Sequence, residues 1–355
     1  MPEVKENPLL ILSSPPHIKS GDSIKNIMWT VVAVLMLPAA YSVYIFGLQT
    51  ASILGVCVLS GISAEFLTQF LMKRKIQILN GSSVITALLL AMSVPPHSPL
   101  WMPAAGTVIA VVVFKEFFGG LGFNIFNPAL AGRAFMTILW PVHMTSNWHI
   151  FPAGSVIAEK LITAGNFTSE VFLAITSATP LTVLKNSGRL AQDYNIPVES
   201  IYYFFISNNL IKSMLIGNVG GCIGETSVLI ILLGGLFLMW RRIITWHVPV
   251  SFIGSMALAT YLYYYNTGST IPGFITMIHV FSGGLFIGAF FMATDMVTTP
   301  LSGRGLFLFG LGCGLITFLI RIIGGYTEGV MFAILLMNLS VPLIDRFFRP
   351  KVFGI

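Results

Sequence analysis

The chain has 355 residues, of which 55% are hydrophobic and only 9% are charged, with a formal net charge of +6 and a mean hydropathy of +0.86. Soluble domains carry about 25% charged residues, so this composition excludes a soluble globular protein. The apolar runs approach the ~20 residues that a helix needs to cross ~30 Å of hydrocarbon, and they lack the short alternating pattern of membrane strands. The sequence therefore predicts an all-α integral membrane protein.

Ten apolar runs are candidate membrane spans, five on each side of a long polar interval. The third run is short for a crossing, and Pro95-Pro96 should end it, so we expect a broken helix there. The predicted spans are residues 26–47, 49–72, 82–96, 100–118 and 125–142, then 225–240, 246–266, 275–294, 305–323 and 327–345.

The two halves resemble each other in the spacing of their helix-breaking residues. Pro95 and Pro300 are 205 positions apart, and so are the pairs Gly119-Gly120 and Gly324-Gly325. Five crossings per half turn the second half upside down, which is an inverted repeat typical of transporters. The predicted division is an N-terminal segment (1–25), a first five-helix repeat (26–142), a polar region (143–222), a second repeat (223–345) and a C-terminal tail (346–355).

Basic residues predict the orientation, because they accumulate on the cytoplasmic side of membrane proteins. With the N-terminus inside, thirteen of the 19 Lys and Arg residues lie on the cytoplasmic side, five lie outside, and Arg133 lies within a span. We therefore expect a bacterial inner-membrane protein with both termini in the cytoplasm and residues 143–222 outside it. The N-terminus shows no removable signal peptide.

The stretch GNVGGCIGETS (217–227) is rich in glycine, but it does not follow a strand as a dinucleotide-binding loop would. Glu225 is expected in the first turn of the following span, where a carboxylate suits the helix dipole. Two interpretations stay open: a glycine-rich start of a helix, or a close approach to a cofactor or an ion.

The stretch GFNIFNPALAGRAF (122–135) places Asn124 and Asn127 three residues apart at a cytoplasmic end of a span, where they would share a face if the helix began there. The topology puts Asp295 on the same side. These groups are either caps and turns or a set of hydrogen-bonding groups that converges on a planar polar ring.

Charged residues inside apolar runs are costly and indicate either ion pairs or an ion path. Glu65 and Arg133 are the candidates for an ion pathway, together with Glu225, and a structural ion pair is the alternative. Lys115, Glu116 and Arg321 lie near span ends, where their side chains are expected to reach the interface.

The cysteines and histidines predict neither a disulfide nor a metal site. Cys57, Cys222 and Cys313 are isolated in or beside apolar segments and are interpreted as packing residues. His279 is the histidine placed well inside a span, and no pair of histidines has metal-binding spacing.

Thr179 lies in the stretch SATPLTVLKNSGR (177–189) of the polar interval. Before Pro180, a threonine usually forms a turn or caps a helix. No histidine or acid has the spacing needed to activate its hydroxyl, so we expect no catalytic residue here.

Five stretches together resemble the D subunits of the Rnf complexes, the ion-translocating ferredoxin:NAD oxidoreductases. That family is homologous to the B subunits of the sodium-pumping NADH:quinone oxidoreductases. The resemblance covers about residues 25–350 and rests on TSATPL (176–181), NGSSVITALLLAMSVPP (80–96), FFGGLGFNIFNPALAGRAF (117–135), GNVGGCIGETS (217–227) and MATDMVTTP (292–300).

The resemblance implies two flavins. In that family FMN is attached through its phosphate to the threonine of a Ser-Gly-Ala-Thr motif outside the cytoplasm, which corresponds to Thr179 here, with Ala178 and Pro180 beside it. This chain departs from the motif, because Ser177 stands where the family usually has glycine. A non-covalent riboflavin is also associated with the family, and Asn124, Asn127 and Asp295 are the positions matched to its site.

The function implied by the resemblance is electron transfer between flavins, coupled to translocation of Na⁺ or H⁺. The chain would then be one part of an oxidoreductase and translocase, with the A, B, C, E and G subunits of the Rnf complex, a flavin transferase and membrane lipid as partners and no nucleic acid. The alternatives are a flavin-free channel or secondary transporter for a small solute, and the corresponding subunit of the quinone reductase.

Overall fold

A computed structural model describes residues 23–146, 179–193, 197–207 and 209–349. Within these ranges the chain forms helices joined by turns and contains no strand, which confirms the predicted all-α class. Of the expected site residues, Ser177 and Ala178 lie outside the described ranges.

The first half contains five helical segments that coincide with the predicted apolar runs. Gly47 joins the first two alone, with a φ of 86° that favours glycine. The third helix ends before Pro95-Pro96, as predicted. The segments are α1 (Ile24–Phe46), α2 (Leu48–Leu71), α3 (Ser82–Met92) after the short 3₁₀ turn Ile78–Asn80, α4 (Trp101–Val111) continued by a π-helical turn (Val112–Glu116), and α5 (Pro128–Leu139).

The second half also consists of helical segments within the predicted apolar runs. Residues 275–294 were expected to form one continuous span, whereas the helices in this range are bent by 61° at a break between Phe281 and Leu285. Gly283, at a φ of 69°, lies at the bend. The segments are α13 (Val228–Trp240), α14 (His247–Asn266), α15 (Pro272–Phe281), α16 (Leu285–Ile287) continued by a π-helical turn (Gly288–Met292), α17 (Gly303–Ile322) and α18 (Val330–Phe347).

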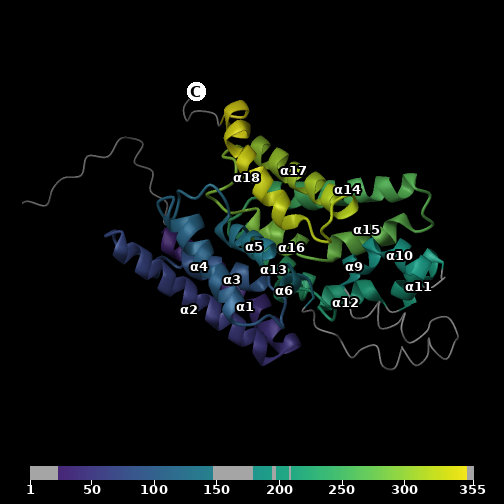
Figure 1. Cartoon of the computed structure of the whole chain (residues 1–355). Helices are drawn as coiled ribbons and strands as arrows, with labels where there is room; N and C mark the ends of the chain where they lie inside the picture. Colours follow the sequence, from purple (N-terminus) through teal and green to yellow (C-terminus); the bar gives the residue numbers. More distant parts are fainter. Residues whose placement is uncertain (1–22, 147–178, 194–196, 208, 350–355) are drawn as a thin grey trace, which may run out of the picture.

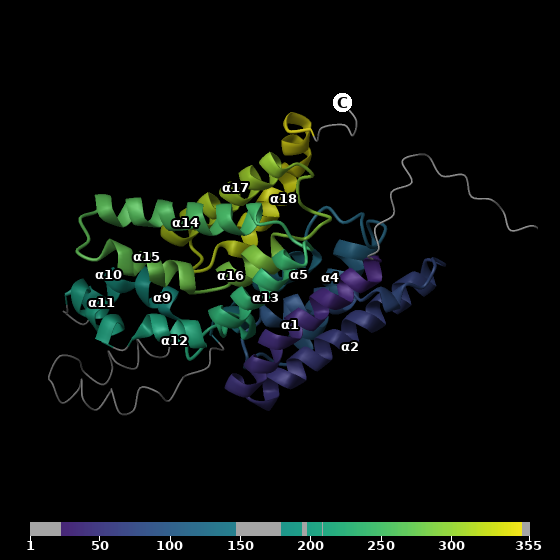
Figure 2. The same cartoon turned by 180° about the vertical axis from the view of Figure 1, so that it is seen from behind.

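The described part of the polar interval is also helical. Several of these helices pack against α15 around a separate small core that includes Val183, Ile201, Met214 and Ile278. Figures 1 and 2 show α9–α12 grouped beside α15 at one end of the molecule. The helices are α6 (Pro141–Ser146), α9 (Pro180–Lys185), α10 (Ser187–Asp193), α11 (Val198–Ser207) and α12 (Leu210–Ile216).

Among the described residues, four helices (α1, α2, α17 and α18) are long and apolar enough to cross a membrane, and the bent pair of α15 and α16 would make a fifth. Helices α3, α5 and α13 are apolar but shorter. Large apolar side chains such as Leu48, Leu59 and Phe347 are exposed, as lipid-facing side chains are. The protein is therefore a multi-pass membrane protein.

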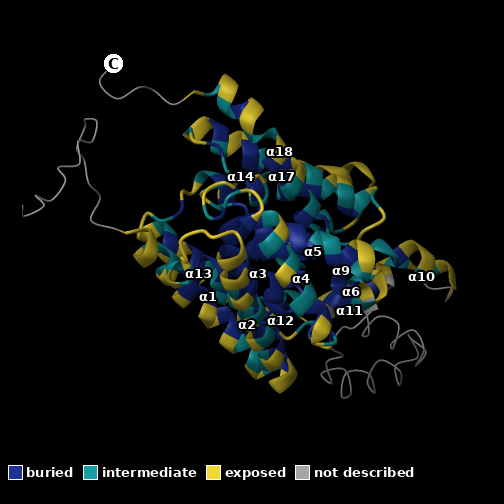
Figure 3. Ribbon diagram, turned by 60° about the vertical axis from the view of Figure 1, so that its left-hand side comes forward, coloured by how far each residue is buried: buried dark blue, intermediate teal, exposed yellow. Residues whose placement is uncertain are grey.

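One apolar core joins the two halves. Its fully buried members include Leu35, Leu90 and Met136 from the first half and Phe252 and Phe309 from the second. Between the halves, α1 packs against α13 and α5 packs against α18. Figure 3 shows the buried residues concentrated where the helices meet and the exposed ones on the outer faces.

Candidate functional site: two cavities and a buried charge cluster

One cavity lies between the halves and is lined by all three residues matched to a ring-binding site. Asn124, Asn127 and Asp295 line it together with apolar residues from α1, α3 and the π-helical turn after α16. The empty space is about 800 Å³, including its open mouth. The structure therefore brings the three polar groups together in an otherwise mainly apolar cavity.

Asn127 holds the two halves together at this cavity. Its side-chain oxygen accepts hydrogen bonds from the amides of Ala129 and Leu130 and so caps α5. Its side-chain nitrogen donates to the Met292 carbonyl at 3.0 Å. Asn127 is thus the N-cap, while Asn124 lies in the preceding loop, so the two do not share a helical face as they would if α5 began earlier.

Asp295 faces Asn124 across the cavity wall. The carboxylate accepts from the Thr298 hydroxyl at 3.3 Å and from the Val297 amide at 3.4 Å, and Asn124 also hydrogen-bonds it. Burial raises the pKa of the Asp295 carboxyl, while these hydrogen bonds act in the opposite direction. The cavity therefore offers an acceptor whose charge depends on what occupies the space beside it.

Asn338, in α18, hydrogen-bonds the backbone beside this cavity, a role that the sequence did not predict. With its amide oxygen facing Asn127, it accepts from the Asn127 backbone amide at 3.1 Å, and its nitrogen donates to the Thr298 carbonyl at 3.2 Å. Because an isolated asparagine in an apolar helix carries no spacing signal, only the fold shows this role.

Glu65 forms an ion pair with Lys115 beside the same cavity. The Lys115 ammonium lies 2.6 Å from the carboxylate of Glu65 and 2.6 Å from the hydroxyl of Ser82, and Ser83 donates to Glu65 at 2.5 Å. Both Lys115 and Glu116 are buried, so the expectation that they reach the membrane interface is wrong. The ion-pair alternative for Glu65 is the one that the structure shows.

Thr179 caps α9 and lines a second, smaller cavity. Its hydroxyl accepts from the Thr182 amide at 3.3 Å and lies 2.8 Å from the Thr182 hydroxyl, while Pro180 occupies the first helical position. The cavity of about 300 Å³ is also lined by Leu181, Glu225 and Gly283. The threonine therefore fulfils the cap interpretation and also faces an open space.

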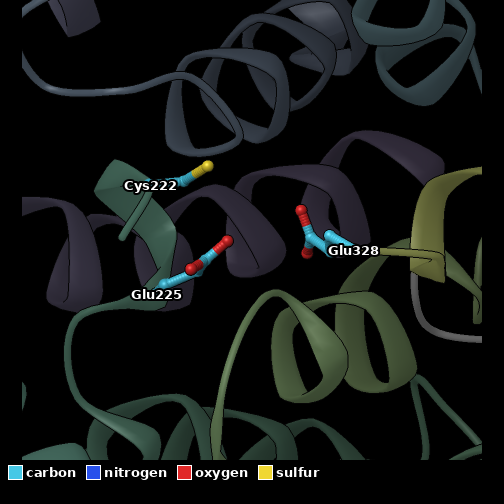
Figure 4. Close-up of side chains that lie close together, drawn as sticks. All are labelled: Cys222, Glu225 and Glu328. Atoms are coloured by element: carbon cyan, nitrogen blue, oxygen red, sulfur yellow. The ribbon is translucent and has the colours of Figure 1, made fainter. Parts of the chain in front are cut away.

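A buried cluster of charges lies next to this cavity, where segments before α13 and α18 meet α5. Arg133 donates to the Glu328 carboxylate at 2.5 Å and lies 3.6 Å from the Cys222 sulfur. One oxygen each of Glu225 and Glu328 and the Cys222 sulfur lie within 4.8 Å of one another. Figure 4 shows the two carboxylates pointing toward each other from different segments.

The cluster corrects two expectations. Glu225 lies in a 3₁₀ turn (Ile223–Glu225) ahead of the Ser227 cap, so it is not in the first turn of α13. Cys222 contacts charged groups and is more than a packing residue, whereas Cys57 and Cys313 are buried free thiols.

Cationic side chains reduce the negative charge that the cluster offers to a metal cation. Three potential ligands are present, but the Arg133 guanidinium already neutralises Glu328. Arg321 lies close enough to influence both carboxylates and donates to the backbone carbonyls of His279 and Ser282. Arg321 is buried, so its expected extension to the interface is wrong too.

Comparison with known proteins identifies close relatives over nearly the whole chain. A family described as NQR2, RnfD, RnfE matches residues 11–354. The chain is 39% identical over 352 residues to the D subunit of the proton-translocating ferredoxin:NAD(+) oxidoreductase complex of Clostridium ljungdahlii (99% of this chain and 98% of that protein). It is 37% identical over 346 residues to the D subunit of the Na(+)-translocating ferredoxin:NAD(+) oxidoreductase complex of Acetobacterium woodii (98% and 96%). It is also 35% identical over 359 residues to the D subunit of the ion-translocating oxidoreductase complex of Escherichia coli (97% and 98%).

Proposed function

Because this chain belongs to the NQR2, RnfD, RnfE family, we propose that it is the membrane electron-carrying subunit of a redox-driven ion pump of the Rnf type. Its relatives in Clostridium ljungdahlii and Acetobacterium woodii are named as D subunits of ferredoxin:NAD(+) oxidoreductase complexes, translocating protons and Na(+), respectively. The chain by itself performs no complete reaction. Electrons pass through it, and the complex moves Na⁺ or H⁺.

The observation that supports this proposal best is the cavity lined by Asn124, Asn127 and Asp295. A non-covalent riboflavin would supply one-electron chemistry there. Two amides and a carboxylate from both halves offer donors and acceptors to the polar edge of a flat ring, while Phe290 and Leu89 line the cavity with apolar surface. These residues would hold and orient the ring and exclude water from it.

The second flavin is FMN, attached by a flavin transferase to Thr179 through a phosphoester. Support comes from the position of Thr179 in the wall of a cavity. Pro180 fixes the start of α9 beside it, and Ser177 and Ala178 complete the attachment sequence.

The proposed architecture has ten crossings in two inverted five-helix repeats, with the Thr179 region outside the inner membrane and both termini inside. The pairings of α1 with α13 and of α5 with α18 support it, because a pseudo-two-fold axis brings equivalent helices together. Pro95 and Pro300 also both lie in breaks that precede a helix, α4 and α17, respectively. The A, B, C, E and G subunits of the Rnf complex are the proposed partners.

A flavin-free transporter remains the alternative of a different class, and the corresponding quinone reductase subunit the alternative within the family. Flavin analysis of the purified subunit tests the proposal against the transporter. We expect riboflavin to be released by acid from the wild-type chain. The variant Asn124→Ala, which removes a cavity amide, should lose it, while the exposed control Asn26→Ala should keep it. A colourless wild-type subunit from an active complex would support the transporter instead.

A further inference from the structure

Glu225 is part of the buried charge cluster and also lines the cavity that contains Thr179. Its carboxylate lies within 4.8 Å of one oxygen of Glu328 in the buried cluster, and it also lines the cavity that contains Thr179. Among the described residues that line this cavity, Glu225 is the one with a titratable side chain. A change in its charge is therefore a change in the electrostatic potential of the cavity.

The hydrogen bonds divide the two carboxylates into different roles. Glu328 accepts from Arg133 at 2.5 Å and from the Gly284 amide at 2.6 Å, an arrangement that stabilises the charged form. Glu225 is hydrogen-bonded by the thiol and backbone of its neighbour Cys222. Arg133 thus makes its charge-assisted hydrogen bond with Glu328, while Glu225 lies close to the Glu328 carboxylate.

The surroundings hold this arrangement in place. A Cβ added at Gly284 would lie 2.6 Å from a Glu328 oxygen, and one at Gly221 would lie 2.5 Å from a Glu225 oxygen. Arg133, 9% exposed, has an Nε with no partner in the described part of the chain, so its terminal nitrogens determine its contacts. A larger residue at either position would therefore require the neighbouring carboxylate to move.

We propose that Glu225 and Glu328 hold one proton between them, that this proton resides on Glu225, and that Glu225 presents it to the cavity beside Thr179. Two carboxylates that share a buried site do not both ionise easily, and the one with the cationic partner keeps the charge. The groups that face Glu225 are Arg133 on α5, Arg321 on α17, Glu328 before α18 and Cys222 on its own segment.

The consequence for electron transfer rests on the proposed function. One electron supplied by the complex adds one negative charge to the cavity. Glu225 would donate its proton to the group that holds the electron, which would offset that charge and leave Glu225 ionised, and Glu225 would take the proton back on oxidation. Glu225 would then link the redox state of the cavity to protonation.

Infrared difference spectroscopy between two pH values tests the proton itself, in full-length chain produced without flavin transferase. We expect the C=O stretching band of a protonated carboxyl at neutral pH in the wild type. Glu225→Gln should abolish this band, and the exposed control Glu199→Gln should leave it unchanged. Absence of the band in the wild type, or its persistence in Glu225→Gln, would overturn the proposal.

Glu328→Gln tests the sharing of the proton. Removing the negative neighbour and freeing Arg133 should lower the pH at which the Glu225 band disappears by about one unit or more, which is about a tenfold loss of proton affinity. An unchanged titration would contradict the pairing. If Glu328→Gln does not fold, Glu225→Asp retracts the acid from Glu328 and should move the titration in the same direction.

The effect of Glu225 on the flavin is measured in a separate experiment, on the complex produced with its flavin transferase. Where mass analysis shows flavin on Thr179, the midpoint potential of that flavin should depend less steeply on pH in Glu225→Gln than in the wild type. Equal pH dependence with the flavin present would contradict the role of Glu225 in the cavity. Loss of the flavin while the infrared band persists would reject the attachment and support the proton pair.

Discussion

Arg133 and Glu328 are 195 positions apart in the chain, yet an Nη of the arginine lies 2.5 Å from a carboxylate oxygen of the glutamate. Arg133 belongs to α5 in the first half, and Glu328 precedes α18 in the second. Since α5 and α18 also pack together, this ion pair fixes the interface of the two halves at the point where the Thr179 cavity begins.

We expect Arg133→Met to destabilise the subunit by about 3–5 kcal/mol, because it leaves Glu328 buried without its cation. The double variant Arg133→Met/Glu328→Gln should recover most of this loss, since neither charge is then unpaired. Thermal unfolding of the detergent-solubilised subunit measures both. Equal unfolding temperatures for the single and double variants would contradict the unpaired Glu328 charge as the cause of the loss.

Close packing of α14 against α17 depends on glycine at position 314. A Cβ there would lie 2.5 Å from the Phe252 carbonyl oxygen and 1.9 Å from the Ser255 hydroxyl oxygen. Gly314→Ala should therefore destabilise the subunit through overpacking by about 1–3 kcal/mol.

Gly254, on α14, is the matched control, because nothing lies within 4 Å of a Cβ added there. Gly254→Ala should leave stability unchanged or raise it by about 0.5–1 kcal/mol, as alanine is the better helix former. The same thermal assay compares the two variants. If both variants lose equal stability, the contact between α14 and α17 at Gly314 does not explain the loss.

Asn127 has two functions that can be separated by substitution. Asn127→Asp keeps an oxygen that caps α5 but loses the hydrogen bond donated to the Met292 carbonyl. Asn127→Ala loses both, so we expect it to cost about 1 kcal/mol more than the aspartate variant. Thermal unfolding ranks the variants. An aspartate variant as unstable as the alanine variant would mean that the bond between halves, not the cap, dominates.

The proposed orientation predicts opposite labelling of two exposed positions. Asp193→Cys, at the end of α10, should react with a membrane-impermeant maleimide in intact cells, and Lys75→Cys, after α2, should react only after lysis. The three natural cysteines are buried, which keeps the background low. Labelling of Lys75→Cys in intact cells would reverse the predicted orientation.

The helices could be predicted because membrane-spanning helices need apolar runs, and because proline and capping residues mark where these helices begin and end. The end of α3 at Met92 follows from Pro95-Pro96, and the start of α5 at Pro128 follows from the Asn127 cap. The bend between Phe281 and Leu285 was missed, because the run 275–294 is apolar and a single glycine such as Gly283 does not predict a positive φ. Composition identifies a span but not its bends.

The partners of the charged residues could not be read from the sequence. Glu65 lies 50 positions from Lys115, and Arg133 lies 195 from Glu328, so helix periodicity gives no information about either pair. The same holds for Glu225 and Thr179, which meet at one cavity only after α9 has packed beside the bend. The motif residues were recognised from their pattern, and their mutual arrangement required the fold.

Mass analysis of the tryptic peptide that contains SATPL, from the chain co-expressed with an active flavin transferase, tests the electron-carrying role most directly. We predict a peptide heavier by FMN minus water, with fragmentation placing the addition on Thr179 rather than on Thr182, whose hydroxyl lies 2.8 Å away. An unmodified peptide beside a fully flavinylated control substrate of the same transferase would contradict the account.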